Sequence, residues 1–447
     1  MKIVDAKNMS AKQTAELMRK PAFDEMKLSE NVKSGIRKTF GEDLSAKEVV
    51  EKIVSDIRTG GDEKLIYYTK SIDGADFTSE SMVVCADEIK EAEQVADRKI
   101  VKALENAIEN VRKFHQEQLP KTWLTFREHG SMLGQKATPL DRVGIYVPGG
   151  SAAYPSSVIM NAVPAVVAGV KEIVMCVPPG RDGKVNPYVL VAARKIGVTK
   201  IIKAGGAQAI AAMAFGTDTV PKVDKITGPG NIFVTLAKKE VYGHCDIDML
   251  AGPSEILIIA DLSADPAYLA ADLLSQAEHD PLSSAILVTD SSALATQVNE
   301  EVEKQLADLP RRELAELAIN GQSMIVVAKD IDEAVELANL SAPEHLEVIT
   351  KAPFELLPRL KHAGAIFLGA YSPEPLGDYY AGPNHVLPTG STARFYSVLN
   401  VETFMKKTSI ISYTKPALTQ AADDIIALAE AEGLSAHANS VRLRIKE

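Results

Sequence analysis

The chain has 447 residues, of which 46% are hydrophobic, so it can bury a large core and fold as two or more domains. Its formal net charge of −11, without any run of lysine and arginine, argues against a nucleic-acid partner. The N-terminus lacks the apolar core of a signal peptide, and no apolar run approaches the roughly 20 residues that span a bilayer. We therefore expect a cytoplasmic globular protein with no membrane partner.

Residues 1 to about 120 are typical of charged amphipathic helices, and strands and helices alternate from residue 143. The first series has expected strands at 143–150, 171–179, 199–206 and 223–230, and expected helices at 156–170, 186–197, 207–217 and 231–243. The second has expected strands at 254–261, 284–290, 323–328, 345–350 and 364–369, and expected helices at 265–280, 291–308 and 330–339. A further helix at 419–433 precedes a polar tail. This alternation predicts two α/β units, built on parallel sheets with helices on both faces.

Three glycine-rich turns follow expected strands of the first unit. They are Gly149-Gly150, Gly205-Gly206 and Gly228-Pro229-Gly230-Asn231. Ligands of open parallel sheets bind at the carboxyl ends of the strands, where glycine lets backbone N–H groups approach a phosphate. Tight strand-to-helix turns also need glycine, and no G-x-G-x-x-G fingerprint is present. These turns alone leave a nucleotide site and a purely structural role both open.

The segment 275–280, SQAEHD, ends the helix expected at 265–280, which Asp265 or Ser263 can cap. At about 100° per residue, one narrow wedge of this helix holds Asp272, Ser275, Gln276 and His279. Taken by itself, the segment favours a solvated face. The alternative is a stripe of ligands, because side chains at i and i+3 meet on one face.

Four of the eight histidines lie near carboxylates or amides. They are His279, His345 after Glu344, His385 after Asp378, and His437 after Glu432. Such groups suit a borderline divalent metal and also acid–base catalysis near neutral pH. The spacing does not show whether they converge. His115 lies in a charged segment, and we expect it at the surface.

Several long motifs, in order, resemble the histidinol dehydrogenase family from about residue 20 to the C-terminus. The motifs are VGIYVPGGSAAYPSSV, GGAQAIAAMAFGT, TGPGNIFVTLAK, DMLAGPSEILIIAD, DLLSQAEHD, APEHLEV, GDYYAGPNHVLPTG and EGLSAHANSVRLR. The resemblance implies two Rossmann-like parallel-sheet domains with small helical N- and C-terminal pieces. It implies a main α/β domain from 25–144 and 253–398, and an NAD-binding domain from 145–252. It also implies a dimer-wrapping domain from 1–24 and 399–424, and a tail from 425–447 that reaches the partner subunit.

The resemblance also implies an activity and a set of site residues. The family oxidises L-histidinol to L-histidine through L-histidinal with two NAD⁺, the last steps of histidine biosynthesis, as a homodimer with one Zn²⁺ per subunit and shared active sites. The implied zinc ligands are Gln276, His279, Asp378 and His437, the last from the partner subunit. The implied acid–base pair is Glu344 and His345. Implied substrate contacts are the same four ligands with His345, Ser254, His385 and Glu432, and implied NAD contacts are Tyr146, Gln208 and Asn231.

In the implied mechanism, His345 takes the alcohol proton and Glu344 activates the water that hydrates the aldehyde. The alternatives are a related enzyme that oxidises another polar alcohol such as a sulfonated diol, a zinc hydrolase, and a non-catalytic relative. The carboxylate of Glu432 favours a cationic substrate. The three glycine turns argue against a hydrolase, and the complete set of matched site residues argues against a non-catalytic relative.

Overall fold

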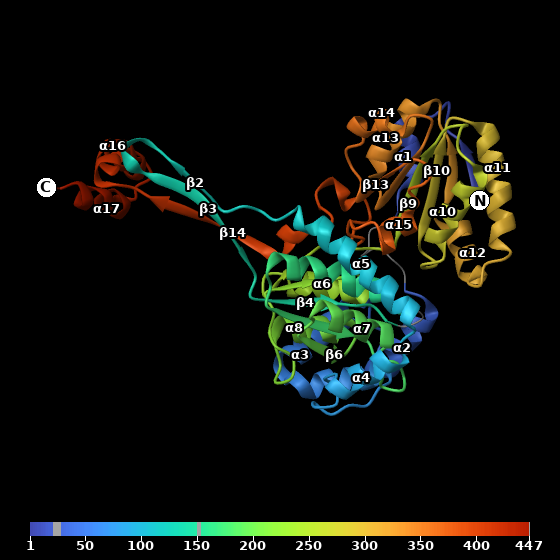
Figure 1. Cartoon of the computed structure of the whole chain (residues 1–447), viewed down its shortest axis with the longest axis horizontal. Coiled ribbons are helices and arrows are strands. Elements are labelled where there is room, and N and C mark those ends of the chain that lie inside the picture. The colour runs from blue at the N-terminus through green and yellow to red at the C-terminus, as the bar shows by residue number, and fades with distance from the viewer. Residues whose placement is uncertain (21–27, 150–152, 447) are drawn as a thin grey trace.

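The computed structural model describes residues 1–20, 28–149 and 153–446. These residues form two α/β units and an arm that projects from the body and carries the C-terminus (Figure 1). The expected α/β class with two parallel sheets is confirmed. Within the described ranges, no helix is long and apolar enough to cross a membrane.

The first unit is built on a five-stranded parallel sheet with the order β6-β5-β4-β7-β8. Its strands are β4 (Arg142–Tyr146), β5 (Glu172–Val177), β6 (Lys200–Lys203), β7 (Lys225–Thr227) and β8 (Asp246–Ile247). Alternate residues of β5 enter different cores: Ile173 and Met175 pack on one face, and Val174 and Cys176 on the other. The strand is apolar on both faces because helices cover both.

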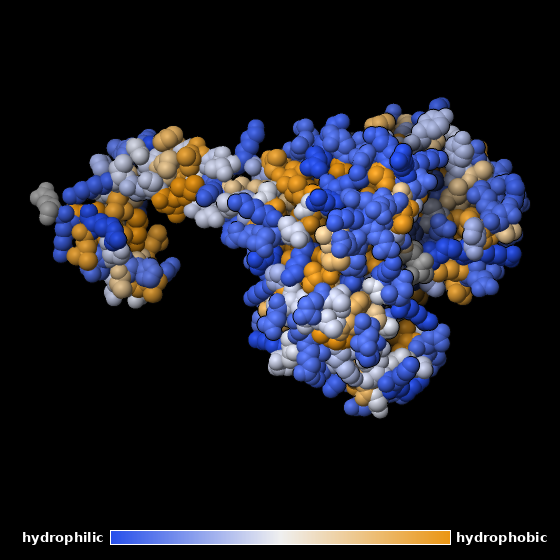
Figure 2. All heavy atoms as spheres, turned by 60° about the horizontal axis from the view of Figure 1, so that its bottom comes forward, coloured by the Kyte–Doolittle hydropathy of each residue, from blue (hydrophilic) through white to orange (hydrophobic). Residues whose placement is uncertain are grey.

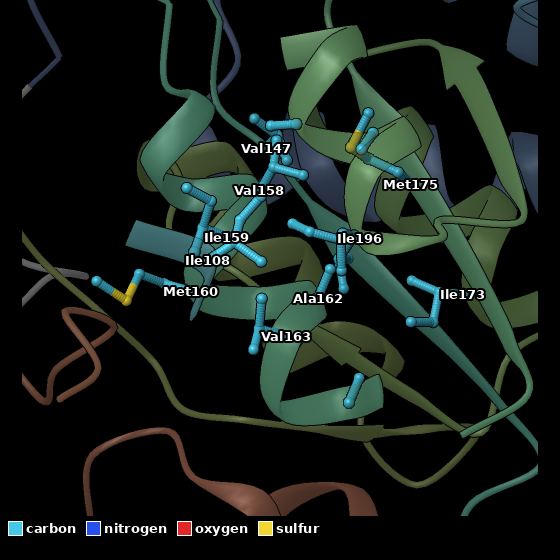
Figure 3. Close-up of a cluster of buried hydrophobic side chains, with 14 of the residues drawn as sticks. Ile108, Val147, Val158, Ile159, Met160, Ala162, Val163, Ile173, Met175 and Ile196 are labelled. Atoms are coloured by element: carbon cyan, nitrogen blue, oxygen red, sulfur yellow. The ribbon is translucent and has the colours of Figure 1, made fainter. Parts of the chain in front are cut away.

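Helices from two parts of the chain cover the two faces of this sheet. One face holds α4 (Ala86–Val95), α5 (Arg98–Gln116), α6 (Pro155–Ala168) and α7 (Pro187–Ile196). The other holds α2 (Glu30–Phe40), α3 (Ala46–Tyr68), α8 (Gly206–Phe215) and α9 (Ile232–Val241). Figure 3 shows the first of these cores, to which α6 contributes Val158 and Val163, β5 contributes Ile173 and α7 contributes Ile196. Helices α2 to α5, within the region expected to be helical before residue 120, therefore form outer layers of this unit.

The second unit is built on a six-stranded parallel sheet with the order β1-β11-β10-β9-β12-β13. Its strands are β1 (Lys2–Asp5), β9 (Glu255–Ala260), β10 (Ser284–Thr289), β11 (Met324–Val327), β12 (His345–Ile349) and β13 (Ala365–Leu368). Helices α10 (Pro266–Ala277), α11 (Ser292–Leu306) and α12 (Arg312–Gly321) pack on one face, and α1 (Ala11–Met18) and α13 (Ile331–Ser341) on the other.

Shorter helices and turns along the whole chain are η1 (Thr69–Asp73), η2 (Glu128–Gly130), α14 (Pro353–Leu356), η3 (Leu357–Arg359), α15 (Glu374–Tyr379), η4 (Thr392–Arg394) and η5 (Val401–Phe404).

The arm consists of a three-stranded antiparallel sheet and two helices. Its elements are β2 (Trp123–Phe126), β3 (Met132–Pro139), β14 (Met405–Ser412), α16 (Lys415–Ala431) and α17 (Ser435–Ile445). β3 lies between β14 and β2, so the sheet joins two segments far apart in the sequence. Apolar side chains are exposed on the arm: Phe126 and Ile411 are each 74% exposed, and Leu428 is 67% exposed. Orange apolar atoms on the arm are visible in Figure 2, as expected for a surface that binds another protein.

The packing groups the chain differently from the boundaries that the resemblance implies. β1 and α1 belong to the second unit, because β1 pairs with β11 and α1 packs on α13. Helices α2 to α5 belong to the first unit, because their apolar faces pack on α6 to α9. β2 and β3, within 25–144, belong to the arm with β14 and α16. The dimer-wrapping role of the terminal segments stays a prediction.

Candidate active site and metal centre

The expected catalytic pair lies at the amino end of a central strand of the second sheet. His345 is the first residue of β12 and Glu344 precedes it, beside Glu255 at the start of the neighbouring strand β9. The two strands run parallel, with His345 opposite Ile256. This site is therefore at the opposite edge from the carboxyl ends of strands, where ligands of open α/β sheets usually bind. In the first sheet, Gly149, Gly205 and Gly228 do follow the carboxyl ends of β4, β6 and β7.

The backbone of Glu255 holds both side chains of the pair. Its N–H donates to Glu344 Oε2 at 2.8 Å, and its carbonyl oxygen lies 3.0 Å from His345 Nδ1. Because a carbonyl oxygen can only accept, Nδ1 carries the proton in this hydrogen bond. Among the described residues, His345 Nε2 has no hydrogen-bond partner, and it lies 3.6 Å from Asp378 Oδ1. In the neutral imidazole this nitrogen holds the lone pair, so the ring is oriented to accept a proton there.

Both members of the pair are buried, with Glu344 6% and His345 3% exposed. Burial raises the pKa of Glu344 to about 8, against the opposing effect of the His345 charge. Burial alone would lower the pKa of His345, but the carboxylates of Glu344 and Asp378 outweigh it and raise that pKa to about 10. A divalent cation beside Asp378 would lower both pKa values, because it repels the imidazolium of His345 and stabilises the carboxylate of Glu344.

Helix α10 places its polar wedge, which includes Asp272 and Gln276, in the interior of the second unit. Asp265 caps the helix by accepting from the N–H of Ala267, and Pro266 occupies the first turn. Asp272 is 8% exposed and Gln276 only 1%. The wedge is buried, so the interpretation of a solvated face is wrong. A buried polar face requires partners from other elements or from a bound ligand.

Three side chains from two segments converge beyond the end of this helix: His279 follows α10, and Glu374 and Asp378 lie on α15. His279, Glu374 and Asp378 each offer a ligand atom within 4.8 Å of the others. One turn before His279, Gln276 is buried with neither Oε1 nor Nε2 hydrogen-bonded within the described part of the chain. A buried amide without partners is costly, and coordination of a cation by Oε1 would satisfy the acceptor. Nitrogen and oxygen donors without a thiolate fit a borderline divalent metal such as Zn²⁺.

Glu374 is a member of this cluster to which no motif of the sequence points. It starts α15, between two prolines, and is 2% exposed. Ser275 Oγ donates to its Oε2 at 2.8 Å, and its own N–H donates to Glu347 Oε1 at 2.8 Å. Burial and the charge of Asp378 raise the pKa of Glu374 to about 7. The hydrogen-bond partners Ser275 and Glu347 are distant from Glu374 in sequence, which explains why local patterns do not reveal this residue.

A second acidic pair lies behind the cluster. Burial raises the pKa of Asp272 to about 6 and, together with the neighbouring Asp272, raises that of Glu347 well above its ordinary value. Both are almost fully buried, at 8% and 1% exposed. The second unit therefore concentrates carboxyl groups around the end of α10, and a bound cation would stabilise their ionised forms.

The loop that carries His385 is fixed by a buried asparagine. Asn384 Nδ2 donates to the Met160 carbonyl at 2.6 Å and lies 3.4 Å from His115 Nε2, and His115 Nδ1 bonds to the Val111 carbonyl at 2.7 Å. His385 Nδ1 lies 3.1 Å from the Asp378 carbonyl, which brings this ring to the cluster. His115 is fully buried, so the expectation of a surface position is wrong. Its segment is charged, but its own face of α5 packs against α6.

Ser254 also lies at the site, but two predicted residues do not. Ser254 immediately precedes Glu255, and its carbonyl accepts from the N–H of Ser284. Glu432 ends α16 and His437 lies in α17, both exposed on the arm. The arm projects away from the second unit of its own chain (Figure 1). Supply of Glu432 and His437 by a partner subunit stays a prediction.

The predicted dinucleotide contacts gather around one cavity at the carboxyl edge of the first sheet. Tyr146, Gly149, Gly206 and Asn231 line this cavity of about 740 Å³. The Tyr146 hydroxyl accepts from the N–H of Gly206 at 3.1 Å. Gln208, two residues further on, is fully buried at the start of α8. Gly150, in the first glycine turn, lies outside the described residues.

A buried ion pair braces the third glycine turn. Lys238 Nζ pairs with Asp248 Oδ1, and their side chains are 3% and 1% exposed. Lys238 also donates to the Gly228 carbonyl at 3.0 Å, and Asp248 Oδ2 accepts from the Gly228 N–H at 2.8 Å. Gly228 has φ +119°, and a Cβ there would lie 2.1 Å from the Tyr146 carbonyl oxygen. Glycine is therefore required for the close approach of this turn to Tyr146.

The chain is similar to known proteins over most of its length. The family model described as histidinol dehydrogenase matches residues 37–445. The chain is 58% identical to the histidinol dehydrogenase of Heliobacterium mobile over 412 residues, covering 92% of this chain and 96% of that protein. It is 55% identical to that of Bacillus subtilis over 398 residues, covering 89% and 93%. The crystal structure of histidinol dehydrogenase from Elizabethkingia anophelis superposes with a TM-score of 0.90 at 38% identity, covering 100% of this chain and 98% of that one. The chain belongs to the histidinol dehydrogenase family.

Proposed function

We propose that this protein oxidises L-histidinol to L-histidine by way of L-histidinal, reducing two NAD⁺, in the last steps of histidine biosynthesis. Family membership supports the substrate and the pathway. The observation that carries the chemistry is the buried His345, whose Nε2 is unbonded within the described chain and lies beside the cluster of His279, Glu374 and Asp378. A proton acceptor next to a cation site suits the oxidation of an alcohol that carries an imidazole and an amine.

We assign a Zn²⁺ site to Gln276, His279 and Asp378, with His437 from the partner subunit. Glu374 lies close enough to His279 and Asp378 to act as a further ligand or to orient Asp378. The unpartnered amide of Gln276 and the concentration of carboxylates support the assignment. Bound Zn²⁺ would supply a Lewis acid that orients the imidazole and amine of the substrate.

The acid–base pair has distinct tasks in the two oxidations. In the first, His345 Nε2 accepts the alcohol proton while hydride leaves the same carbon for NAD⁺, giving L-histidinal, NADH and one proton. Glu344 then takes a proton from a water molecule while the oxygen of that water adds to the aldehyde carbon. His345 accepts a proton from the resulting hydrate while hydride leaves for the second NAD⁺, giving the carboxylate of L-histidine. The Glu255 backbone keeps both side chains in place through these steps.

We further propose that the protein acts as a homodimer with shared active sites. The exposed apolar side chains of the arm, among them Phe126, Ile411 and Leu428, support an interface there. Glu432 and His437 lie on that arm, away from the second unit of their own chain. Transfer of the arm to the partner would complete the metal and substrate sites. A cytoplasmic location stays a prediction.

The proposal is tested by following NADH formation with L-histidinol as substrate. We expect NADH to form with L-histidinol but not with an alcohol that lacks the imidazole. A chelator should abolish the reaction, and added Zn²⁺ should restore it. NADH formation that is equally fast with simple alcohols would contradict the substrate assignment, and full activity in metal-free protein would contradict the metal assignment.

A further inference from the structure

A carboxylate from outside the first α/β series lines the cavity at the carboxyl edge of that sheet. Asp73, at the end of η1, lies on the cavity with Tyr146, Gly206 and Asn231. Its Oδ2 accepts from the N–H of Gly205 at 3.1 Å and from Gln208 Nε2 at 3.2 Å. Neither bond uses Oδ1. The carboxylate is thus anchored through one oxygen, and the other can accept a hydrogen bond from a ligand.

The surroundings of Asp73 fix its position. A Cβ on Gly205 would lie 2.7 Å from Pro178 Cγ and 3.2 Å from Asp73 Oδ1, so a side chain at this position would displace Pro178 or Asp73. Gln208 donates a hydrogen bond from Nε2 to Asp73, whereas its buried Oε1 has no hydrogen-bond partner within the described residues. Burial raises the pKa of Asp73 to about 6, against the two hydrogen bonds it accepts. The group is therefore mostly ionised at neutral pH.

The strand order shows which part of a dinucleotide this carboxylate faces. The order β6-β5-β4-β7-β8 corresponds to the 3-2-1-4-5 arrangement of a dinucleotide-binding half. In that arrangement an acidic residue at the end of the second strand binds the adenosine ribose. Here the second strand, β5, is followed by Pro178 and Pro179 instead of an acid. Asp73 is bonded to Gly205, at the end of the adjacent strand β6, and occupies this side of the sheet.

The opposite side of the sheet leads to the catalytic strand. β8 is at the far edge from β6, and the chain passes from β8 directly to β9 with Glu255. Thr235 of α9 donates to the Ala251 carbonyl within this connection at 2.9 Å. The nicotinamide half must reach His345, so it belongs on the β7 and β8 side. The adenosine half is then left on the β6 side, near Asp73.

From this placement we propose that Asp73 binds the 2′- and 3′-hydroxyls of the adenosine ribose and thereby selects NAD⁺ over NADP⁺. This inference rests on the proposed use of NAD⁺. Oδ1 offers a charged acceptor to the ribose hydroxyls, which strengthens those hydrogen bonds. A 2′-phosphate would meet a fixed negative charge and would lose the hydrogen bond that the 2′-hydroxyl donates. Specificity of this kind combines a favourable contact with one ligand and repulsion of the other.

The test is the dissociation constant of NAD⁺ and of NADP⁺, measured by isothermal titration calorimetry with the full-length protein. For the unaltered protein we expect NAD⁺ to bind about 100-fold more tightly than NADP⁺, as repulsion of like charges at a binding site predicts. In Asp73→Ser, NAD⁺ should bind about 10-fold more weakly and NADP⁺ more tightly, so that the preference falls to a few-fold. Asp73→Asn keeps the size of the side chain and should lose most of the preference as well. Asp76→Ser is the matched control, because Asp76 lies on the same segment and pairs with Lys70 at the surface.

The outcomes separate this assignment from the proposed function. If the unaltered protein neither binds nor reduces NAD⁺, the proposed use of NAD⁺ is wrong. If it uses NAD⁺ but both folded Asp73 variants keep the full preference, or weaken both dinucleotides equally, Asp73 does not read the adenosine ribose. A preference of the unaltered protein for NADP⁺ would overturn the assignment too and would point to Arg181, an exposed cation on the same cavity. Circular dichroism of each variant checks that it folds, and Asp73→Asn provides the measurement if Asp73→Ser does not.

Discussion

The carbonyl oxygen of Glu255 accepts a hydrogen bond from His345 Nδ1 at 3.0 Å. The other ring nitrogen of His345, Nε2, is thereby directed away from β9. The same residue fixes Glu344 through its N–H at 2.8 Å. Glu344, just before β12, and His345, the first residue of β12, are therefore both held by the backbone of the neighbouring strand β9. This arrangement keeps the tautomer and the orientation of the base constant while substrates exchange.

The separate tasks of Glu344 and His345 predict different defects in their variants. His345→Asn should slow both hydride transfers by about 10²–10⁴, the usual cost of losing a general base. Glu344→Gln should slow the oxidation of histidinal much more than the first oxidation of histidinol, because only the later step needs activated water. Single-turnover measurements of NADH with each substrate test this. If Glu344→Gln slows the first hydride transfer as much as His345→Asn does, the two residues act as one coupled base.

The position of Glu374 predicts a role in metal binding. Its carboxylate lies within 4.8 Å of the ligand atoms of His279 and Asp378, so Glu374→Gln should weaken Zn²⁺ binding. Removal of a residue that orients a metal ligand weakens metal affinity about 10–100-fold. His279→Asn removes a ligand itself and should weaken Zn²⁺ affinity more. The measurement is Zn²⁺ content by mass spectrometry after equilibration with a competing chelator. Glu278→Gln is the control, because this neighbour of His279 is outside the cluster. Equal Zn²⁺ retention in Glu374→Gln and the control would exclude Glu374 from the site.

Sharing of the active site between subunits predicts complementation. His437→Asn protein and a Glu344→Gln, His345→Asn double variant should each be inactive. In a mixed dimer, one site receives an intact His437 together with an intact catalytic pair, so activity should return to at most half of that of the unaltered dimer. Co-expression with two affinity tags isolates the mixed dimer. An inactive mixed dimer of confirmed composition would mean that each site is built within one chain.

The burial of His115 predicts a loss of stability in acid. Burial lowers the pKa of this imidazole, against the hydrogen bond to the Val111 carbonyl, so the folded protein keeps it neutral. As pH falls below about 6.5, the unfolded chain binds a proton that the folded chain excludes, and the free energy of unfolding falls by up to about 1.4 kcal/mol per pH unit. His115→Gln removes this titration. The melting temperature of the unaltered protein should therefore drop more than that of His115→Gln between pH 7 and pH 5. A constant difference between the two across that range would show that His115 titrates alike in both states.

The sequence predicts the two α/β units well, because their strands are apolar and the alternation with helices is local. The expected strands near 143 and 345 correspond to β4 and β12, and the cap of α10 by Asp265 is also as expected. The strands β1, β2, β3, β8 and β14 are not predicted. β1 pairs with β11 and β3 with β14, so partners distant in the sequence, and not local patterns, decide their structure.

The candidate site is predicted in part for the same reason. His279 and Asp378 follow from motifs, and the structure brings them together. Glu374 and Asp73 have no such signal, because each acts through contacts with residues far away in the chain. His115 shows the converse error: its charged neighbours suggest the surface, whereas packing between α5 and α6 buries it. Burial of a single side chain is a property of the packed fold and not of its neighbours in sequence.

The central claim is that one site performs two successive oxidations of histidinol. The most direct measurement is the amount of NADH formed per L-histidinol consumed, with the product identified by mass spectrometry. We predict two NADH for each L-histidinol, L-histidine as the product, and little free histidinal, because a closed site retains a reactive intermediate. One NADH per L-histidinol, with histidinal accumulating in solution, would contradict the proposed mechanism.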